Sequence, residues 1–568
     1  MANRIVVDPI TRIEGHLRIE ADLEGNTIKK AYSAGTMVRG IELILKGRDP
    51  REAWAFAQRI CGVCTSVHAL SSIRAVEDAL DIKVPKNASL IRKLMEGTIM
   101  VHDHVVHFYQ LHLLDWINPI TALKANPQKT AQLALTHSKA PKNSVEYFNA
   151  VLEKLKKLTA SKQLGIFTNG YWDHPDYKLT PEENLLLLAH YLEALVWQSK
   201  LVQIHTLFGG KNPHPNYLVG GIPAPINLNG NAPVNMDSLE KVNTIIDDAI
   251  AFVEEYYLPD LKLIAKNYPK WFDIGENLGN FLVLGEPEYD SHRDNKWFIP
   301  PTFIQDRDLN NPQNIDYKQI KEYVTHSWYD YSVGDDKGLH PFEGETNLHY
   351  TGPKPPFEHL NTNEKYSWVK APRYKDYSVE TGPLARVVAL YARDLHGIKA
   401  EVDTLFSELN MPIEKIYSTM GRTLARGLDA KLYAHSMKKW FNELMQNIKS
   451  GDTKTANQEK WQPSTWPKDT KGYGIMEAPR GSLSHWVHIK DEKIENYQAV
   501  VPTTWNASPR DAKGQPSAYE SSLLNHTLAK LKEPLEILRT IHSFDPCMAC
   551  AVHVYDKKSN KTFKVKIQ

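Results

Sequence analysis

The chain has few cysteines for its length, with only four among 568 residues. Disulfide frameworks belong to short, cysteine-dense chains, so a secreted framework is not expected here. No apolar run reaches the roughly 18 residues that a transmembrane helix requires. Neither sign of charge dominates, because 68 Lys and Arg accompany 67 Asp and Glu and leave a net charge of +1. Nothing in this balance points to nucleic acid or to an anionic membrane surface as a partner.

The N-terminus also lacks a feature, since the sequence MANRIVVDP contains no apolar stretch of the kind that a signal peptide carries. We therefore expect that any export of the protein depends on another chain. Apolar residues make up 42% and charged residues 24% of the chain, which is ordinary for a soluble globular protein. A chain of this length can bury a large core.

The four cysteines form two Cys-x-x-Cys pairs near opposite ends of the chain, Cys61 with Cys64 and Cys547 with Cys550. Each pair can present two thiolates to one metal ion, and four thiolates suit zinc, iron in a cluster, or nickel. Structural zinc modules usually draw both pairs from one compact segment, whereas nearly the whole chain separates these two. Spacing alone leaves three readings open: a structural zinc site, another metal or redox centre, or two unrelated buried pairs.

Periodicity predicts a mainly α (α+β) fold. Apolar and polar residues alternate from Leu17 to Leu23, which predicts a small sheet within residues 4–35. Asp49-Pro50 favours a helix start, and the helix would contain Cys61 and Cys64 or break near Gly62. Further apolar helical patterns cover residues 88–115, 180–209, 237–266, 383–408, 412–449 and 517–541.

We expect a central bundle of long helices with small peripheral β-sheets, one at the N-terminus and others in an irregular insertion over residues 270–380. Residues 451–472 are expected to be an exposed loop. If the two cysteine pairs share a metal, the N- and C-termini must meet at a buried metal site. Residues 1–553 are then a single interwoven domain, and residues 554–568 remain as a basic C-terminal tail.

The residues around the cysteines carry a family resemblance. Residues 59–68 read RICGVCTSVH and residues 545–553 read DPCMACAVH, and both are similar to the cysteine signatures of [NiFe]-hydrogenase large subunits. Residues 8–16, DPITRIEGH, resemble the N-terminal signature of the same family. Further blocks match in order at residues 35–42, 102–109, 478–481 and 500–506. The resemblance extends from end to end and is closest to membrane-associated uptake hydrogenases.

The resemblance implies that all four cysteines bind nickel. Cys61 and Cys547 would be terminal ligands, whereas Cys64 and Cys550 would bridge nickel to an iron that carries carbon monoxide and two cyanides. Heterolytic cleavage of H2 needs a hydride acceptor and a nearby base. A terminal thiolate can serve as that base, and we expect Cys547 to take the proton.

Three further roles follow from the resemblance. Glu14 matches the proton-relay carboxylate, although the local sequence by itself favours an ion pair with Arg12. Arg480 matches the arginine over the open side of the metals, where it would donate to a cyanide; without the resemblance it would be read as a surface ion pair. Pro502 and Thr503 match positions at the other diatomic ligands, where Pro502 would pack on them and the Thr503 hydroxyl would donate to them; many relatives carry Ser in place of Thr503.

For two residues the functional and the structural readings remain open. Asp103 could orient Arg480, or it could be an ordinary buried cap or ion pair. His68 could donate to a cysteine sulfur, or it could be a core histidine with its hydrogen bonds satisfied.

Other positions are assigned by resemblance alone. Glu42 and His553 match the ligands of a magnesium or similar divalent ion, although magnesium ordinarily prefers oxygen ligands. Val63 and Leu111 match apolar positions that narrow the gas channel, and both are otherwise simply core residues.

The function implied is reversible, heterolytic oxidation of H2 in the uptake direction. Because no cysteine is left for an electron relay, an iron–sulfur small subunit is expected as partner, with a membrane cytochrome b or other quinone-linked subunit beyond it. The resemblance also implies nickel-insertion factors and a maturation protease that cuts after His553, and a location at the periplasmic face of the cytoplasmic membrane. The alternatives are a hydrogen-sensing regulatory subunit, a quinone-binding relative without the metal, and a zinc-stapled protein.

Overall fold

The computed structural model describes residues 3–162, 170–276, 278–353 and 359–551. His553, the residues 554–568 expected as a maturation peptide, and the proposed cleavage point all lie outside the described residues. Among the helices of the described ranges, none combines the length and apolar character needed to cross a lipid bilayer.

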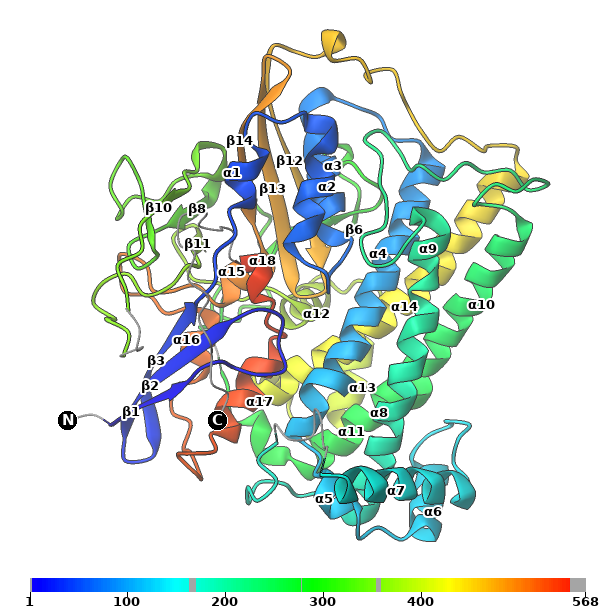
Figure 1. The fold of residues 1–568 in the computed structure, drawn as a ribbon, viewed down its shortest axis with the longest axis vertical. Coiled ribbons are helices and arrows are strands. Elements are labelled where there is room, and N and C mark those ends of the chain that lie inside the picture. Colours follow the sequence, from blue (N-terminus) through cyan, green and yellow to red (C-terminus); the bar gives the residue numbers. More distant parts are fainter. Residues whose placement is uncertain (1–2, 163–169, 277, 354–358, 552–568) are drawn as a thin grey trace.

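Four long helices run side by side through the centre of the molecule (Figure 1): α4 (Lys86–Val106), α8 (Pro181–Leu201), α10 (Met236–Phe252) and α14 (Thr419–Lys449). They confirm the predicted mainly helical fold with a central bundle. Around them lie α5 (Pro119–Ala122), α6 (Pro127–His137), α7 (Val145–Ala160), α9 (Gln203–Gly209), α11 (Leu258–Asn267), α12 (Pro383–Ala392) and α13 (Ile398–Glu408).

The helix ends follow local sequence signals. Thr180 and Glu183 form a capping box at the start of α8, and Gly210 ends α9 in the left-handed conformation. The helix predicted over residues 88–115 is interrupted, because α4 passes into a π-helical segment, His107–His112. A π-helical turn adds a residue to the helix and reorients the side chains that follow, and this one includes Leu111.

The N-terminal sheet is present as predicted. It consists of β1 (Asn3–Val7), β2 (Leu17–Glu24) and β3 (Thr27–Gly35) in antiparallel order β1-β2-β3. A short helix, α1 (Ile41–Leu45), follows it.

Of the two alternatives for the first cysteine pair, the break near Gly62 is confirmed and a helix that runs on through both cysteines is wrong. Asp49 caps only a 3-10 turn, Pro50–Glu52, which is followed by α2 (Ala53–Ala57) and a second 3-10 turn. The chain then leaves the helix until α3 (Val67–Leu80) begins. In this gap the backbone N–H groups of Val63 and Cys64 donate to the Cys61 sulfur, each at 3.3 Å. These thiolate contacts replace the hydrogen bonds that a helix would have made.

A second three-stranded sheet, the β12–β14 sheet, was not predicted. It contains β12 (Asp469–Ala478), β13 (Gly481–Lys490) and β14 (Lys493–Val500) and packs against α3, so the loop expected over residues 451–472 ends where β12 begins. Most residues of β13 are buried on both faces, including the polar Ser482, Ser484 and His485, so burial in this strand does not follow residue polarity, which is what pattern analysis relies on. Gly474 permits the close approach to α3, because a Cβ there would lie 2.0 Å from the Ser71 carbonyl oxygen.

Two predicted helical stretches are also divided. Residues 383–408 form α12 and α13, and residues 517–541 contain only α16 (Ala518–Ser522) and the beginning of α17 (Leu535–Ser543). Within residues 270–380, buried aromatic residues such as Trp271, Trp328 and Tyr366 anchor short strands to the body. These strands are β4 (Phe281–Val283), β5 (Glu286–Pro287), β6 (Trp297–Ile299), β7 (Thr302–Ile304), β8 (Ile320–Tyr323), β9 (Tyr329–Asp330), β10 (Asn347–Leu348) and β11 (Ala371–Tyr374).

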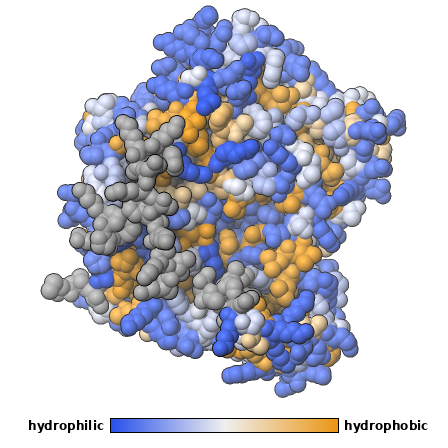
Figure 2. Space-filling model, in the orientation of Figure 1, coloured by the Kyte–Doolittle hydropathy of each residue, from blue (hydrophilic) through white to orange (hydrophobic). Residues whose placement is uncertain are grey.

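Segments from the two ends of the chain meet inside the fold. Glu14 forms a parallel β-bridge with Cys547, just before α18 (Met548–Ala551). In Figure 1 α18, in red, lies next to α15 (Pro502–Asn506) and close to the blue N-terminal segments, with α17 below them. Figure 2 shows the same face of the molecule, with polar residues around the edge and apolar residues visible across the middle.

Candidate metal centre

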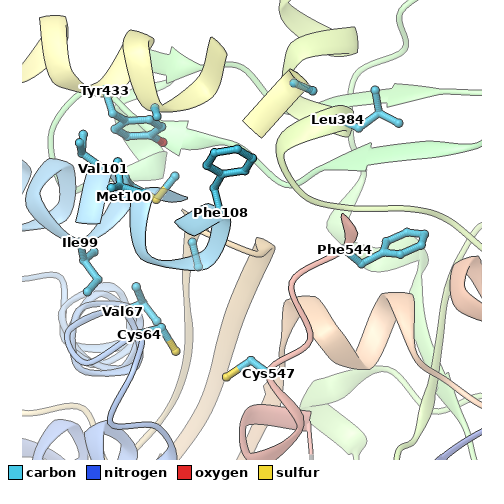
Figure 3. Packing of buried hydrophobic residues seen from close by; sticks show 14 of the residues in the cluster. Cys64, Val67, Ile99, Met100, Val101, Phe108, Leu384, Tyr433, Phe544 and Cys547 are labelled. Atoms are coloured by element: carbon cyan, nitrogen blue, oxygen red, sulfur yellow. The ribbon is translucent and has the colours of Figure 1, made fainter. Parts of the chain in front are cut away.

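The four cysteine sulfurs converge in one cluster. All four Sγ atoms lie within 4.8 Å of one another, and all four cysteines are buried. Cys61 and Cys547 are separated by 3.4 Å between their sulfurs, and Cys64 and Cys550 by 3.3 Å. Figure 3 shows Cys64 and Cys547 approaching each other from two different segments, with Val67 and Ile99 packed nearby. Each end of the chain therefore supplies half of a four-sulfur site.

Four buried thiols in such close contact are electrostatically unfavourable as anions. Burial, with the neighbouring sulfurs, raises the pKa of Cys547 and of Cys550 well above the ordinary thiol value. A bound metal cation reverses this effect, because a coordinated thiol loses its proton. The donor set therefore fits a soft or borderline metal ion such as nickel or zinc.

Glu14 lies directly beside the sulfurs. Its Oε2 accepts hydrogen bonds from the Cys547 thiol at 3.2 Å and from the Ala549 backbone N–H at 2.8 Å. Its own carbonyl oxygen accepts from Met548 N–H at 2.8 Å. Gly15 makes this contact possible: its φ is +81°, and a Cβ there would lie 2.5 Å from the Ala549 nitrogen. Burial, followed by repulsion from Cys61, raises the pKa of Glu14, as a proton relay requires.

Arg480 is buried between two carboxylates. Its Nη1 donates to Asp103 Oδ2 at 2.9 Å, and its Nη2 lies 3.1 Å from Asp545 Oδ1. Although burial opposes the charge, these carboxylates raise the pKa of Arg480. Burial raises the pKa of Asp545 to about 6. Asp103 thus contacts Arg480, which fits both readings left open for it, a carboxylate that orients Arg480 and a buried ion pair, whereas Asp545 had been given no role.

A cavity lies beside Cys64 and Cys550. It is small, with a volume of roughly 10 Å³ open to a water molecule, and is lined by Cys64, Val67, His68, Ala478, Pro479, Arg480, Pro502, Thr503, Cys547 and Cys550. Arg480 Nε has no acceptor among the described residues. Thr503 Oγ1 accepts from Cys547 N–H at 3.1 Å, so its own proton can be donated elsewhere. The cavity thus offers apolar walls and two polar donors next to three sulfurs.

His68 contacts a sulfur and is the first member of a buried chain of polar groups. Its Nε2 lies 3.3 Å from Cys550 Sγ, and its Nδ1 lies 3.0 Å from His485 Nε2. His485 in turn contacts the Tyr497 hydroxyl at 2.6 Å. Burial lowers the pKa of His68 to about 4, so the ring is neutral near pH 7. His485 and Tyr497 were not identified from the sequence, because they lie on the sheet that was missed.

Glu42 lies apart from the sulfurs, buried beside strand β14. Its carboxylate accepts from Ala499 N–H at 3.1 Å and from the Thr346 hydroxyl at 2.5 Å. Lys370 Nζ lies 3.7 Å from the same carboxylate. Burial raises the pKa of the neighbouring Glu322 to about 7. Glu42 is the one expected magnesium ligand that the described residues include, since His553 lies outside them.

Val63 and Leu111, the two positions expected to narrow the gas channel, are both half-buried. Val63 follows Cys61 in the non-helical gap, and Leu111 lies in the π-helical segment. The Leu111 carbonyl accepts from Arg12 Nη1 at 2.7 Å, and Arg12 also pairs with Asp115 at 2.5 Å. Arg12 therefore contacts Asp115, and its expected ion pair with Glu14 is not among the described salt bridges.

A closed zinc site fits these surroundings poorly. Structural zinc needs four ligands and no open space, whereas this cluster has a cavity on one side and a carboxylic acid on the other. A cavity with hydrogen-bond donors next to three thiolates suits a metal with additional ligands. The residues present therefore fit a reactive metal centre, and the zinc staple becomes the weaker reading.

Comparison with known proteins agrees with this geometry. The profile of the nickel-dependent hydrogenase family matches residues 39–553, and a HoxL-like profile matches residues 4–33. The chain is 50% identical to the uptake hydrogenase large subunit of Bradyrhizobium diazoefficiens and 48% identical to the Hydrogenase-1 large chain of Escherichia coli. Each alignment covers 100% of this chain and 97% of the relative.

Solved structures show the same likeness. The [NiFeSe] hydrogenase of Desulfovibrio vulgaris Hildenborough in its reduced state aligns with a TM-score of 0.77 and 30% identity, over 97% of this chain and 100% of that one. Because the family profile covers most of the chain and includes both cysteine pairs, this chain belongs to the nickel-dependent hydrogenase family.

Proposed function

We propose that this chain is the catalytic large subunit of an uptake [NiFe]-hydrogenase, which oxidises H2 to two protons and two electrons. The observation that carries the proposal is the convergence of Cys61, Cys64, Cys547 and Cys550 on one buried point, with Glu14 in contact with Cys547. The relatives that share about half of the sequence are named uptake hydrogenases, which supports the uptake direction.

The chain's own residues would handle the proton. Nickel and iron, when bound, supply the acceptor for the electron pair of H2. The Cys547 sulfur is the base closest to Glu14, at 3.2 Å from its Oε2. Because its pKa is raised, the Glu14 carboxyl can receive a proton from this sulfur and release it toward solvent.

We propose that iron with carbon monoxide and two cyanides would be held on the side of the cluster where Cys64 and Cys550 line the small cavity. Arg480 Nε and the Thr503 hydroxyl are the donors available to the cyanides, and Pro502 lines the wall. His68 would donate to Cys550 and Asp103 would orient Arg480. Magnesium held by Glu42 and His553 remains a proposal supported only by the resemblance and by the buried Glu42 carboxylate.

Electrons must leave through a second protein. All four cysteines of the chain belong to the metal cluster, so none remains to hold an iron–sulfur relay. A hydrogenase large subunit implies a small-subunit partner, and we propose that this partner carries iron–sulfur clusters. Exposed apolar side chains such as Leu43 and Ile44, 46% and 42% exposed on α1, support coverage of this surface by another chain.

The wider assembly is also proposed. A cytochrome b or other quinone-linked membrane subunit would accept the electrons, and the complex would work at the periplasmic face of the membrane after export with the small subunit. Nickel-insertion factors and a maturation protease would act beforehand.

The function is tested by co-expressing the chain with its small subunit and maturation factors and measuring H2-dependent reduction of a viologen dye. We expect sustained reduction by the purified complex, and none when Cys547→Ser is introduced, because the serine hydroxyl is a poor ligand for a soft metal. A complex that contains nickel and iron but reduces no dye under H2 contradicts the proposal.

Glu14→Gln tests the proton route. The amide preserves the volume and can still accept from Ala549 N–H, but it cannot carry the proton. We expect turnover to fall by about 100-fold or more, with the metal content and melting temperature unchanged. Glu24→Gln, an exposed change at the end of β2, is the control and should retain full activity. Wild-type turnover in the Glu14→Gln enzyme would exclude Glu14 as the relay.

Maturation is tested by the intact mass of active enzyme. Cleavage after His553 removes residues 554–568, so we expect a mass that corresponds to residues 1–553. Active, metal-loaded protein that retains the last residues would show that cleavage is not required.

A further inference from the structure

A second buried arginine lies behind the turn that carries Arg480. Arg386, on α12, is 0% exposed and uses all of its donor nitrogens. Nε and Nη2 form a fork on the Asp429 carboxylate, at 3.1 Å to Oδ1 and 2.6 Å to Oδ2. Nη1 donates to Glu477 Oε2 at 3.2 Å. Two carboxylates thus fix the plane of this guanidinium, since a fork has only one good orientation on its partner.

The same guanidinium also holds the backbone that leads into Arg480. Nη1 donates to the Ala478 carbonyl oxygen at 2.9 Å, and Nη2 donates to the Pro479 carbonyl oxygen at 3.2 Å. These carbonyls belong to the two residues directly before Arg480, where β12 turns into β13. Gly382, directly before α12, also packs closely on this turn, because a Cβ there would lie 3.1 Å from the Arg480 carbonyl oxygen.

A second series of contacts leads from Arg386 back to the Arg480 side chain, through Asp429, His104 and Asp103. Asp429, on α14, accepts from His104 Nε2 at 2.7 Å. His104 is adjacent on α4 to Asp103, whose carboxylate accepts from Arg480 Nη1 at 2.9 Å. Arg480 is therefore fixed at both ends, its side chain by Asp103 and its backbone by Arg386. Both attachments depend on the packing of α4 and α14 against each other.

We propose that Arg386 is a positioning residue for H2 oxidation: through its hydrogen bonds to the Ala478 and Pro479 carbonyls it sets where the Arg480 guanidinium lies over the metal centre. The inference rests on the proposed function, because it assumes that Arg480 acts on the bound iron and its cyanides. Arg386 does not line the cavity beside Cys64 and Cys550. Its effect reaches the site only through the turn, and small displacements of a functional group are costly.

The test compares two arginine-to-lysine variants in the purified, metal-loaded complex. Arg386→Lys keeps the charge but has one nitrogen in place of the planar fork, so it cannot hold Asp429 and both carbonyls together. Arg92→Lys is the matched control: Arg92 is also 0% exposed, forks onto Glu77 at 3.0 and 2.8 Å, and donates to the Gly221 carbonyl. Each variant is measured for kcat, KM for H2, melting temperature and the infrared bands of the metal-bound cyanides.

We expect Arg386→Lys to shift the cyanide bands and to lower kcat by about tenfold or more, with little change in KM. The melting temperature of Arg92→Lys should fall by about as much as that of Arg386→Lys, whereas its cyanide bands and kcat should stay at the wild-type values. Unshifted bands with wild-type kcat in Arg386→Lys overturn the proposal. So does an equal shift in Arg92→Lys, because the effect would then be one of general destabilisation.

If Arg386→Lys does not accumulate, Asp429→Asn decides in its place. This variant retains Arg386 and the side-chain volume but weakens the carboxylate that orients it. A shift of the cyanide bands supports the positioning role, and unchanged bands overturn it. The proposed function fails separately, because the wild-type complex would then show neither cyanide bands nor H2-dependent dye reduction.

Discussion

The structure depends on one constraint: four thiolates, two from each end of a 568-residue chain, must share one cation. Buried and in contact, the four sulfurs repel one another as anions, so the closed arrangement needs a metal to stabilise it. A metal bound there would join the segment before α3 to Cys547 and Cys550, which lie just before and within α18. This explains why the N- and C-terminal regions are interwoven and why the cysteine pairs can lie so far apart in sequence.

The same constraint organises the charges around the cluster. Glu14 reaches the sulfurs only because Gly15 lets its loop pack against the backbone of Ala549. Arg480 supplies positive charge on the other side, where Asp103 and Asp545 hold it. Under the proposed function, the Glu14 carboxyl with its raised pKa would be the proton exit and the Arg480 guanidinium a polar wall of the cavity. The acidic side comes from the loop before β2 that carries Glu14, and the basic side comes from the turn between β12 and β13 that carries Arg480.

The sequence was informative where function constrains residue type locally. The paired cysteines and their flanking residues predicted the metal cluster, and Glu14, Arg480, Thr503 and His68 all lie at or beside it. The helical bundle followed from apolar periodicity. The roles assigned to these residues remain predictions, because contact alone does not establish what a group does.

The rest depended on long-range packing, which a linear pattern does not contain. β13 was missed because its residues are buried on both faces. The sequence left open whether the helix continues through Cys61 or breaks near Gly62, and it breaks there, where the N–H groups of Val63 and Cys64 donate to the Cys61 sulfur. Asp545 is part of the second cysteine signature, so its place beside the site could have been predicted. The position of Arg386 behind the site could not have been predicted, because its partners Asp429 and Glu477 come from elements distant in sequence.

The central claim is that both cysteine pairs bind one nickel ion. X-ray absorption at the nickel edge, measured on the purified complex with metal analysis of the same sample, tests it most directly. The account predicts one nickel per chain in a shell dominated by sulfur, with iron present as a near neighbour of the nickel. Zinc in place of nickel, or nickel surrounded mainly by nitrogen and oxygen, would contradict it.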